Sequence, residues 1–455
     1  MQQMVGAGLA DAPAAVVHAP MALLPVPFPR ATFQQAKQAA TVFNIVMDAV
    51  SRDEAYLQAV LAPAAQHDEF TARLLEVLAS TASERGSRRE AEGVLAVLRS
   101  DYMLHEPSNA LLQVEVNTIA SSFGCLSTLV GRMHAYLVGR LDGQVPGLDA
   151  SAAAAAMPPN NAMDEIVDAM GAAVAEYGCQ GAAMLMVVQP GERNAYDQQW
   201  LQTRLWDRHR VRTLRRSLGQ LSQQGRLDAC GRLSVDDTPV ALVYFRAGYT
   251  PADYHGSADW DARLMVERCD AFKCPNVAWQ LAGAKKVQQD LAAPGVLERY
   301  APSAADAALL RGLFAGLWGL EDLSQPGTAA AVADALSHPE RYVLKPQREG
   351  GGNNLYGEAL AARLARGGPG LAAYILMQRI QPPVHRAVML RNGAAGEADT
   401  LSELGVYGTF VRRGSRVLLN REAGHLVRTK AASSDEGGVA AGYAVLDSPM
   451  LVDLC

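Results

Sequence analysis

The chain has 455 residues, of which 49% are hydrophobic and 19% are charged, and its formal net charge is −6. This length and composition are typical of a water-soluble protein with two or three globular domains. The negative net charge argues against nucleic acid or an anionic membrane as a partner. No segment reaches the roughly 18 consecutive apolar residues that a membrane span requires.

The first 20 residues are rich in alanine, contain Asp11 and lack arginine, so neither a secretory nor an organellar signal is expected. We expect a cytoplasmic protein, with a plastid as the alternative if a transit peptide has been removed. The cysteines form no C-x-x-C pair and no cluster with histidine, which favours a reduced protein without structural zinc. They are Cys125, Cys179, Cys230, Cys269, Cys274 and Cys455.

After an irregular, proline-containing start over residues 1–30, the N-terminal third shows helical and strand-like patterns. Apolar residues recur every three or four positions over residues 31–51, which predicts an amphipathic helix, and residues 71–78 predict another. Residues 113–117 alternate, with valines on one face and Glu115 and Asn117 on the other. A strand with a carboxylate and an amide on one face is unusual for a simple edge strand.

The middle of the chain predicts a compact α/β unit. Residues 149–161 are rich in alanine, proline and asparagine and mark a boundary. Residues 182–188 and 240–245 are continuous apolar runs, typical of strands buried on both faces of a parallel sheet. Further elements are expected as helices over 304–317 and 328–336 and strands over 374–377 and 403–411.

A glycine-rich segment over residues 345–357 is the most informative motif. Consecutive glycines allow the backbone to approach phosphate oxygens and to present its N–H groups to them. Lys345 is suited to contact phosphate, and Glu349 and Asn354 carry the hard oxygen ligands that Mg²⁺ prefers. Tyr356 can pack beside a base or ribose. A plain hairpin turn is the structural alternative for any isolated run of this kind.

Polar residues also follow the two buried strands, where α/β sheets bind ligands. Residues 192–194 follow the first strand and residues 246–249 follow the second. Each motif alone is compatible with a turn or a surface segment, but together they indicate one site assembled from several strand ends. Motifs for a P-loop, a dinucleotide fold, a serine hydrolase or a zincin are absent from the sequence.

In this order along the chain, the motifs resemble those of the eukaryotic-type glutathione synthetases, a family of ATP-grasp ligases, over nearly the whole length. The segments that carry the resemblance are 99–103, 115–123, 192–194, 244–249, 281–288, 345–357, 402–405, 424–430 and 437–442. The resemblance implies a mixed α/β (α+β) ATP-grasp fold and a homodimer. It further implies an ATP-grasp body over 31–180 and 284–455, a lid at about 338–398 and an inserted α/β substrate-binding domain over 181–283.

The family resemblance also implies the reaction. ATP converts the cysteinyl carboxylate of γ-glutamylcysteine into an acyl phosphate, and glycine then displaces phosphate, so ADP and phosphate are released. No enzyme nucleophile is needed, and catalysis relies on positioning and charge neutralisation. Two alternatives stay open: a homoglutathione synthetase that uses β-alanine, and a catalytically inactive nucleotide-binding protein. The plant β-alanine branch has a Leu-Pro pair where this chain keeps alanines after Val439, which favours glycine.

The resemblance to this family also implies roles for particular residues. Two Mg²⁺ ions are expected at Glu115, Asn117 and Glu349, and the residues expected to act in catalysis are Arg428, Lys345 and Gly351. Nucleotide contacts are expected from Lys285, Lys345, Gly350, Gly351, Gly352, Asn354, Tyr356, Met377, Gln378, Arg379, Ile380, Glu403 and Lys430. Substrate contacts are expected from Arg99, Ser122, Glu192, Asn194, Gln198, Arg246, Tyr249, Arg428, Val439 and Ala440. The chain departs from the common pattern at Ala120, Ala247, Gln378 and Glu436, none of which is an expected metal ligand.

Overall fold

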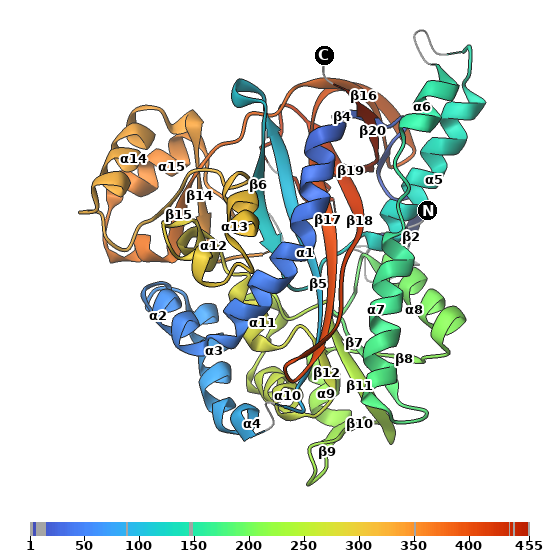
Figure 1. The fold of residues 1–455 in the computed structure, drawn as a ribbon, viewed down its shortest axis with the longest axis vertical. Coiled ribbons are helices and arrows are strands. Elements are labelled where there is room, and N and C mark those ends of the chain that lie inside the picture. The colour runs from blue at the N-terminus through green and yellow to red at the C-terminus, as the bar shows by residue number, and fades with distance from the viewer. Residues whose placement is uncertain are drawn as a thin grey trace.

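The computed structural model describes residues 3–5, 15–87, 90–144, 149–349, 352–435, 437–439 and 442–453. A mixed sheet of thirteen described strands runs through the centre of the molecule, in the order β16-β3-β19-β18-β17-β5-β12-β11-β10-β9, with β6 paired to β5 and β7 to β11 and β8 (Figure 1). Helices pack on both faces of this sheet. The predicted α/β class is therefore confirmed.

The helices are α1 (Arg30–Arg52), α2 (Glu54–Ala65), α3 (Glu69–Ser80), α4 (Ala82–Ser87), α5 (Gly124–Arg140), α6 (Ala150–Ala156), α7 (Ala162–Tyr177), α8 (Ala195–His209), α9 (Leu218–Gln224), α10 (Ser257–Arg268), α11 (Val277–Ala282), α12 (Lys285–Ala292), α13 (Ala304–Arg311), α14 (Pro326–Ser337) and α15 (Gly357–Arg366). Short 3₁₀ helices span Glu106–Ser108, Pro251–Asp253, Leu297–Arg299, Pro339–Arg341 and Pro369–Ala373.

The strands are β1 (Gln3–Val5), β2 (Ala15–Val17), β3 (Met21–Ala22), β4 (Val26–Pro29), β5 (Gly93–His105), β6 (Ala110–Asn117), β7 (Ala183–Val187), β8 (Thr213–Arg216), β9 (Gly225–Leu227), β10 (Leu233–Val235), β11 (Thr238–Phe245), β12 (Phe272–Cys274), β13 (Leu317–Gly319), β14 (Tyr342–Pro346), β15 (Tyr374–Gln378), β16 (His385–Arg391), β17 (Ala394–Arg413), β18 (Arg416–Ala431), β19 (Ala444–Asp447) and β20 (Pro449–Val452).

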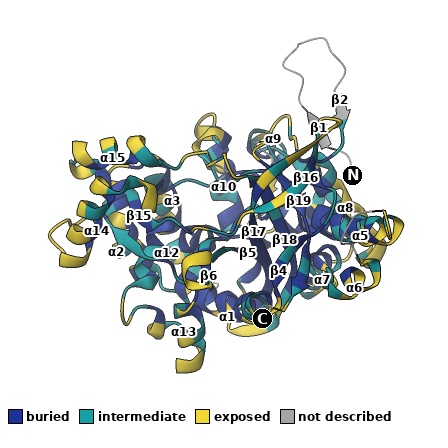
Figure 2. Cartoon of the chain, turned by 90° about the horizontal axis from the view of Figure 1, so that it is seen from above, coloured by how far each residue is buried: buried dark blue, intermediate teal, exposed yellow. Residues whose placement is uncertain are grey.

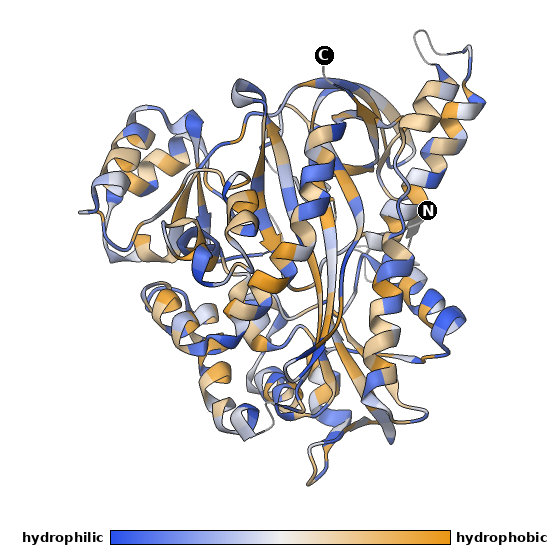
Figure 3. Ribbon diagram, in the orientation of Figure 1, coloured by the Kyte–Doolittle hydropathy of each residue, from blue (hydrophilic) through white to orange (hydrophobic). Residues whose placement is uncertain are grey.

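Strand β5 shows why the central sheet is buried on both faces. Successive side chains of a strand point to opposite faces. Val94, Ala96 and Leu98 belong to the core shared with α1, whereas Leu95 and Val97 belong to the core shared with α7. The two helices lie on opposite sides of the central strands in Figure 1. Seen from above, these strands are dark with burial, and the hydropathy colouring is correspondingly orange along them (Figures 2 and 3).

Most of the predicted elements are present. The helix expected over 31–51 is α1, and the apolar runs at 182–188 and 240–245 are β7 and β11, which pair in parallel. All of β7 is buried between β8 and β11, as its continuous apolar run predicts. Among the helices of the described ranges, none is both long and apolar enough to cross a membrane.

A separate lobe stands beside the main sheet, on the left of Figure 1. It consists of the three-stranded sheet β13-β15-β14 and the helices α14 and α15, which share a small apolar core. Leu344 and Leu355 exchange backbone hydrogen bonds of 3.0 and 2.9 Å, which close the base of the glycine-rich segment. Of this lobe, β14, α15 and β15 fall within the expected lid at about 338–398, whereas β13 and α14 precede it, and the division of the chain into domains stays a prediction.

One buried carboxyl group makes the stability of this fold depend on pH. Asp447 is 1% exposed and accepts hydrogen bonds from the Thr429 hydroxyl at 2.6 Å and the Ser448 backbone N–H at 2.7 Å. Burial raises the pKa of Asp447 from 3.8 to about 7, in spite of these hydrogen bonds. The folded protein therefore holds this proton more tightly than the unfolded chain does.

Between pH 4 and pH 7 the unfolded chain loses that proton while the folded protein retains it, so stability falls as pH rises through this window. An Asp447→Asn variant removes the titration. We expect the melting temperature of the variant, relative to the unmodified protein, to increase from pH 5 to pH 8, which thermal denaturation at both pH values measures. A difference that does not change with pH would contradict the prediction.

Candidate active site

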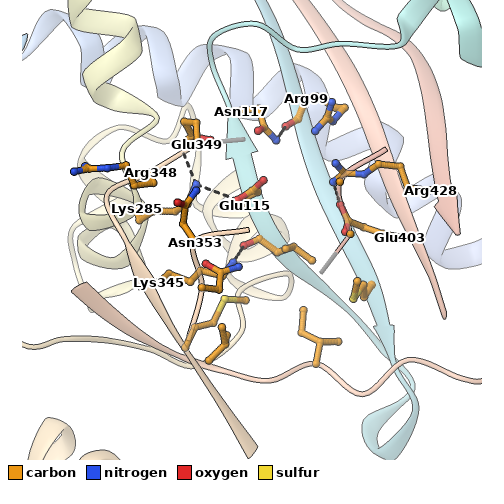
Figure 4. Close-up of a pocket in the computed structure, with 18 of the residues that line it drawn as sticks. Arg99, Glu115, Asn117, Lys285, Lys345, Arg348, Glu349, Asn353, Glu403 and Arg428 are labelled. Atoms are coloured by element: carbon orange, nitrogen blue, oxygen red, sulfur yellow. Dashed lines mark hydrogen bonds and ion pairs between the residues drawn. The ribbon is translucent and has the colours of Figure 1, made fainter. Parts of the chain in front are cut away.

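A pocket of about 260 Å³ opens between the central sheet and the three-stranded lobe. It draws its walls from β5, β6, the start of α12, the glycine-rich segment, the end of β15 and the paired strands β17 and β18 (Figure 4). Predicted site residues that line it are Arg99, Glu115, Asn117, Ser122, Tyr249, Lys285, Lys345, Glu349, Asn354, Tyr356, Met377, Gln378, Arg379, Ile380, Glu403, Arg428, Lys430 and Val439.

On one wall of the pocket a single ammonium group joins two carboxylates. Lys285 Nζ lies 3.0 Å from Glu115 Oε2 and 2.9 Å from Glu349 Oε1. Burial opposes the charged form of Lys285, but attraction by Glu115 and Glu349 outweighs it and raises the lysine pKa. Burial raises the pKa of Glu349, opposed by Lys285 and reinforced by repulsion from Glu115. The two carboxylates are thus held close together on the pocket wall.

The donor set on this wall suits a divalent cation. The Asn117 amide nitrogen donates to the backbone carbonyl of Arg99 at 3.2 Å and to Asp101 Oδ2 at 2.9 Å, which leaves its oxygen as an acceptor beside Glu115. Mg²⁺ is usually held by one or two carboxylates and by the phosphates of its substrate. In the part of the chain that the structure describes, no three His, Cys, Asp or Glu side chains form a metal-binding cluster. Two carboxylates and an amide fit a metal that shares its ligands with phosphate.

The neighbouring part of the pocket combines a lysine with an apolar slot. Lys345 is 4% exposed and donates from Nζ to the Val114 carbonyl at 2.8 Å, and burial lowers its pKa. Met377 and Ile380 are buried in one apolar cluster that Tyr356 packs against. A charged group next to a flat apolar slot is suited to a nucleotide. Gly350, Gly351 and Ala440 lie outside the described residues.

Asp101 connects several site residues, and our sequence analysis did not single it out. It is 0% exposed and accepts hydrogen bonds from Arg99 Nε at 2.7 Å and Arg99 Nη2 at 2.8 Å. Arg428 Nη2 and the Asn117 amide each donate to its Oδ2 at 2.9 Å. Arg428 also pairs with Glu403. The sequence does contain a signal for Asp101, since it lies two residues after Arg99 and therefore on the same strand face.

The residues predicted to bind a dipeptide divide between two places. Arg99, Ser122 and Tyr249 line the pocket, whereas Glu192, Asn194, Gln198 and Arg246 do not belong to its described lining. Arg246 Nη2 donates to the Ser122 hydroxyl at 2.7 Å and so joins the two groups.

The second group contains buried polar atoms without a hydrogen-bond partner in the described structure. These atoms are both side-chain polar atoms of Asn194, Gln198 Oε1 and Arg246 Nε. A buried polar atom without a partner is costly, and a polar ligand would satisfy it.

Asp197 is a second residue that the sequence analysis did not identify. Its Oδ2 accepts hydrogen bonds from the Phe123 N–H at 2.9 Å and Arg246 Nη1 at 3.2 Å, and its Oδ1 accepts one from the Leu126 N–H at 3.2 Å. The carboxylate thus fixes the turn after β6 against Arg246. Nothing in the local pattern of α8 distinguishes it from an ordinary charge in the first turn of a helix.

Comparison with known proteins identifies the family. A family model described as eukaryotic glutathione synthase, ATP-binding domain, matches residues 4–451. A chloroplastic glutathione synthetase of Solanum lycopersicum is 47% identical over 441 residues, covering 96% of this chain and 78% of that protein. Glutathione synthetase of Homo sapiens is 40% identical, covering 95% of this chain and 90% of that protein. The chain belongs to the eukaryotic glutathione synthetase family.

A solved structure agrees with this membership at the level of the fold. A glutathione synthetase-like effector from Globodera pallida, in its apo form, superposes with a TM-score of 0.73 at 20% identity. The match covers 96% of this chain and 91% of that one. The predicted ATP-dependent ligase with glutathione synthetase function is confirmed, with ATP as co-substrate. The roles of individual residues of this chain stay predictions.

Replacing Asp101 by asparagine tests whether it orders the pocket. An amide nitrogen would face a guanidinium group, Arg99 would lose its charged partner Asp101, and Arg428 would keep only Glu403. Misplacement of catalytic groups by about 1 Å can lower the rate about 100-fold, so we expect kcat/KM to fall by about 100-fold. Steady-state ATP turnover measures this. Asp164→Asn, which breaks a partly exposed pair with Arg204, serves as a control and should change turnover little. Turnover of Asp101→Asn within threefold of the unmodified protein would contradict the prediction.

Proposed function

We propose that this protein joins γ-glutamylcysteine to glycine with ATP, through an acyl phosphate, and releases ADP and phosphate. One observation carries the proposal: a single pocket brings together lysines beside two carboxylates and, elsewhere in its lining, the arginines Arg99 and Arg428. Lys285 and Lys345 suit the polyphosphate, and Arg99 and Arg428 suit carboxylates. The reaction requires phosphate-binding and carboxylate-binding groups around one pocket, so that the two reacting groups meet there, and family membership supplies the reaction type.

In the first step, a carboxylate oxygen of the cysteinyl residue attacks the γ-phosphorus of ATP. The new O–P bond replaces the bond to the β-phosphate oxygen, and ADP leaves. Lys285 and Lys345 neutralise charge on the phosphates, and Tyr356, Met377 and Ile380 receive the base. Two Mg²⁺ ions held by Glu115, Asn117 and Glu349 would neutralise phosphate charge further.

In the second step, the amine of glycine attacks the acyl carbon. The C–N bond forms, the C–O bond to phosphate breaks, and the amine gives its proton to the departing phosphate or to water. Arg428 holds the glycine carboxylate and stabilises the negative charge that develops on the acyl oxygen. Its contacts with Asp101 and Glu403 fix the guanidinium before the substrate arrives.

The buried polar atoms of Asn194, Gln198 and Arg246 support a site for the γ-glutamyl end of the dipeptide. That end carries an α-amine and an α-carboxylate. Amide and guanidinium groups bind a carboxylate, and Glu192 binds an amine, which matches this composition. In the structure, Glu192 accepts hydrogen bonds from the Asn194 N–H at 2.7 Å and from the Gln198 side-chain amide at 2.5 Å.

For the amine that accepts the acyl group, β-alanine is a close alternative to glycine. Val439 is 3% exposed and packs in the core beside the pocket, and the alanines that follow it lie outside the described residues. β-Alanine is longer than glycine by one methylene, which a pocket distinguishes by only about 1–3 kcal/mol. We propose glycine as the preferred acceptor because the chain keeps these small residues.

Two further properties belong to the proposal. We infer a homodimer from the family resemblance, and light scattering on the purified protein tests it. We place the protein in the cytoplasm, with a plastid as the alternative. Relatives from Solanum lycopersicum and Arabidopsis thaliana are named chloroplastic, whereas those from Mus musculus and Homo sapiens are not.

The acceptor is tested by an assay of ADP release with ATP, Mg²⁺ and γ-glutamylcysteine, in which glycine and β-alanine are offered separately. We expect turnover with glycine to exceed that with β-alanine by at least about tenfold, the discrimination expected for one methylene. A preference for β-alanine would retain the ligase but overturn the acceptor. Absence of ADP with either acceptor would favour the inactive nucleotide-binding protein.

Two substitutions test the proposed roles on opposite walls of the pocket. Glu349→Ala removes an expected metal ligand, and Arg428→Ala removes the expected carboxylate receptor. Each should reduce ligation by at least about 1,000-fold, because each removes a buried charged contact to the reacting groups. The same assay measures the loss, and circular dichroism and light scattering check that the variants stay folded and associated. Arg416→Ala, which breaks a surface pair with Glu176, should leave turnover unchanged. Near-normal turnover of either pocket variant would show that its role is misassigned.

A further inference from the structure

Three consecutive side chains at the start of the glycine-rich segment contact other elements of the fold: two contact the first turn of α12, and one contacts the N-cap of α3. Gln347 Oε1 accepts the backbone N–H of Lys286, in the first turn of α12, at 3.1 Å. Glu349 Oε1 accepts Lys285 Nζ at 2.9 Å. Between them, Arg348 Nη1 donates to Asp68 Oδ2, which lies 280 residues earlier in the chain.

Asp68 uses its two oxygens for two different purposes. It is the N-cap of α3, where Oδ1 accepts the Thr71 N–H at 3.0 Å, and Oδ2 receives Arg348. The Asp68 side chain is 4% exposed and that of Arg348 is 28% exposed. Their ion pair is thus largely shielded from water on the aspartate side, where a lost partner is costly.

A second cavity of about 40 Å³ lies between α3 and the segment. Its lining includes Phe70 and Leu74 from α3, and Arg348 and Glu349 from the segment. The polar contacts of Gln347, Arg348 and Glu349 therefore connect the start of the segment to α12 and, beside this cavity, to α3.

The position of Arg348 has a consequence for the pocket. Arg348 also lines the large pocket, as do Glu349 and Glu115, and Figure 4 shows its side chain directed away from these two carboxylates. A guanidinium group that is not held by Asp68 would be free to pair with these carboxylates (Figure 4). It would then compete with a cation for the ligands that the proposed function assigns to Mg²⁺.

We propose that Asp68 is a positioning residue for nucleotide binding. By holding Arg348 away from Glu115 and Glu349, it keeps both carboxylates available and fixes the backbone that carries Glu349. The inference rests on the proposed function, because the bound molecule is taken to be the magnesium complex of ATP. Neither the motifs nor the family resemblance assigned a role to Asp68, which lies outside the large pocket.

The substitution Asp68→Asn separates the capping of α3 from the ion pair with Arg348. Asp and Asn are equally good N-caps, so Asp68→Asn retains the α3 cap and removes only the charge that holds Arg348. Isothermal titration with the non-hydrolysable analogue AMP-PNP, at several Mg²⁺ concentrations, measures binding without turnover. We expect the Kd to rise about tenfold, as for one lost charge-assisted hydrogen bond, and the difference to shrink as Mg²⁺ increases. The melting temperature should change by less than about 2 °C.

Asp53→Asn is the matched control. Asp53 is the N-cap of α2, accepts the Tyr56 N–H at 3.0 Å and lies 3.6 Å from an Arg299 nitrogen, but it does not line either cavity in the described structure. It therefore has the same capping role without the link to the segment, and its ion pair is more exposed, with side-chain exposures of 34% for Asp53 and 57% for Arg299. AMP-PNP binding by Asp53→Asn should equal that of the unmodified protein.

Arg348→Gln and the double variant Asp68→Asn/Arg348→Gln complete the test. If Asp68 acts through Arg348, the double variant binds AMP-PNP no more weakly than the weaker single variant. Unchanged binding by Asp68→Asn, or equal weakening by Asp53→Asn, would overturn the proposal. Weak binding by Arg348→Gln together with unchanged binding by Asp68→Asn would show that Arg348 acts without Asp68, as in a direct contact with phosphate, and would overturn the proposal. Failure of the unmodified protein to ligate would overturn the proposed function, while the binding comparison would still test Asp68.

Discussion

The register of β5 against its two neighbours is the constraint on which the pocket depends. Arg99 pairs with Asn117 of β6, and Asp101 pairs with Glu115 of β6 and with Gly405 of β17. In an antiparallel pair, opposed residues place their side chains on the same face, so this register gathers charged groups from separate strands. A shift by one residue would turn them toward the opposite face and dismantle the pocket.

Gly405 shows how little space this register leaves. A Cβ atom at that position would lie 2.8 Å from Asp101 Oδ1 and 2.9 Å from Arg99 Cδ, which is closer than real contacts allow. Glycine permits the bidentate pair between Asp101 and Arg99 to lie directly over β17. The same pair receives Arg428, whose strand partner across the β17–β18 ladder is Glu403. Backbone geometry and charge pairing therefore support each other.

The pairing of buried charges in the pocket follows from this strand register. Buried charges are tolerated when each has a partner, and here Asp101, Glu115 and Glu349 each contact at least one arginine or lysine. The pocket is consequently ordered before substrates bind, which reduces the reorganisation needed during reaction. The contact between Arg348 and Asp68 extends this order to the N-terminal helices, because it connects α3 to the segment that carries Glu349.

The sequence by itself determined the class of fold, most of the long elements and the composition of the pocket. Alternation along residues 113–117 placed Glu115 and Asn117 on one face, because the period of two is a local property of a strand. The order of motifs indicated the family, and eighteen of the predicted site residues line one pocket. Only the tertiary structure revealed Asp101 as a shared partner, Asp197 as a support for Arg246 and Asp68 as the partner of Arg348. These contacts join residues far apart in sequence or depend on side-chain direction, and neither is encoded in the local pattern of residues.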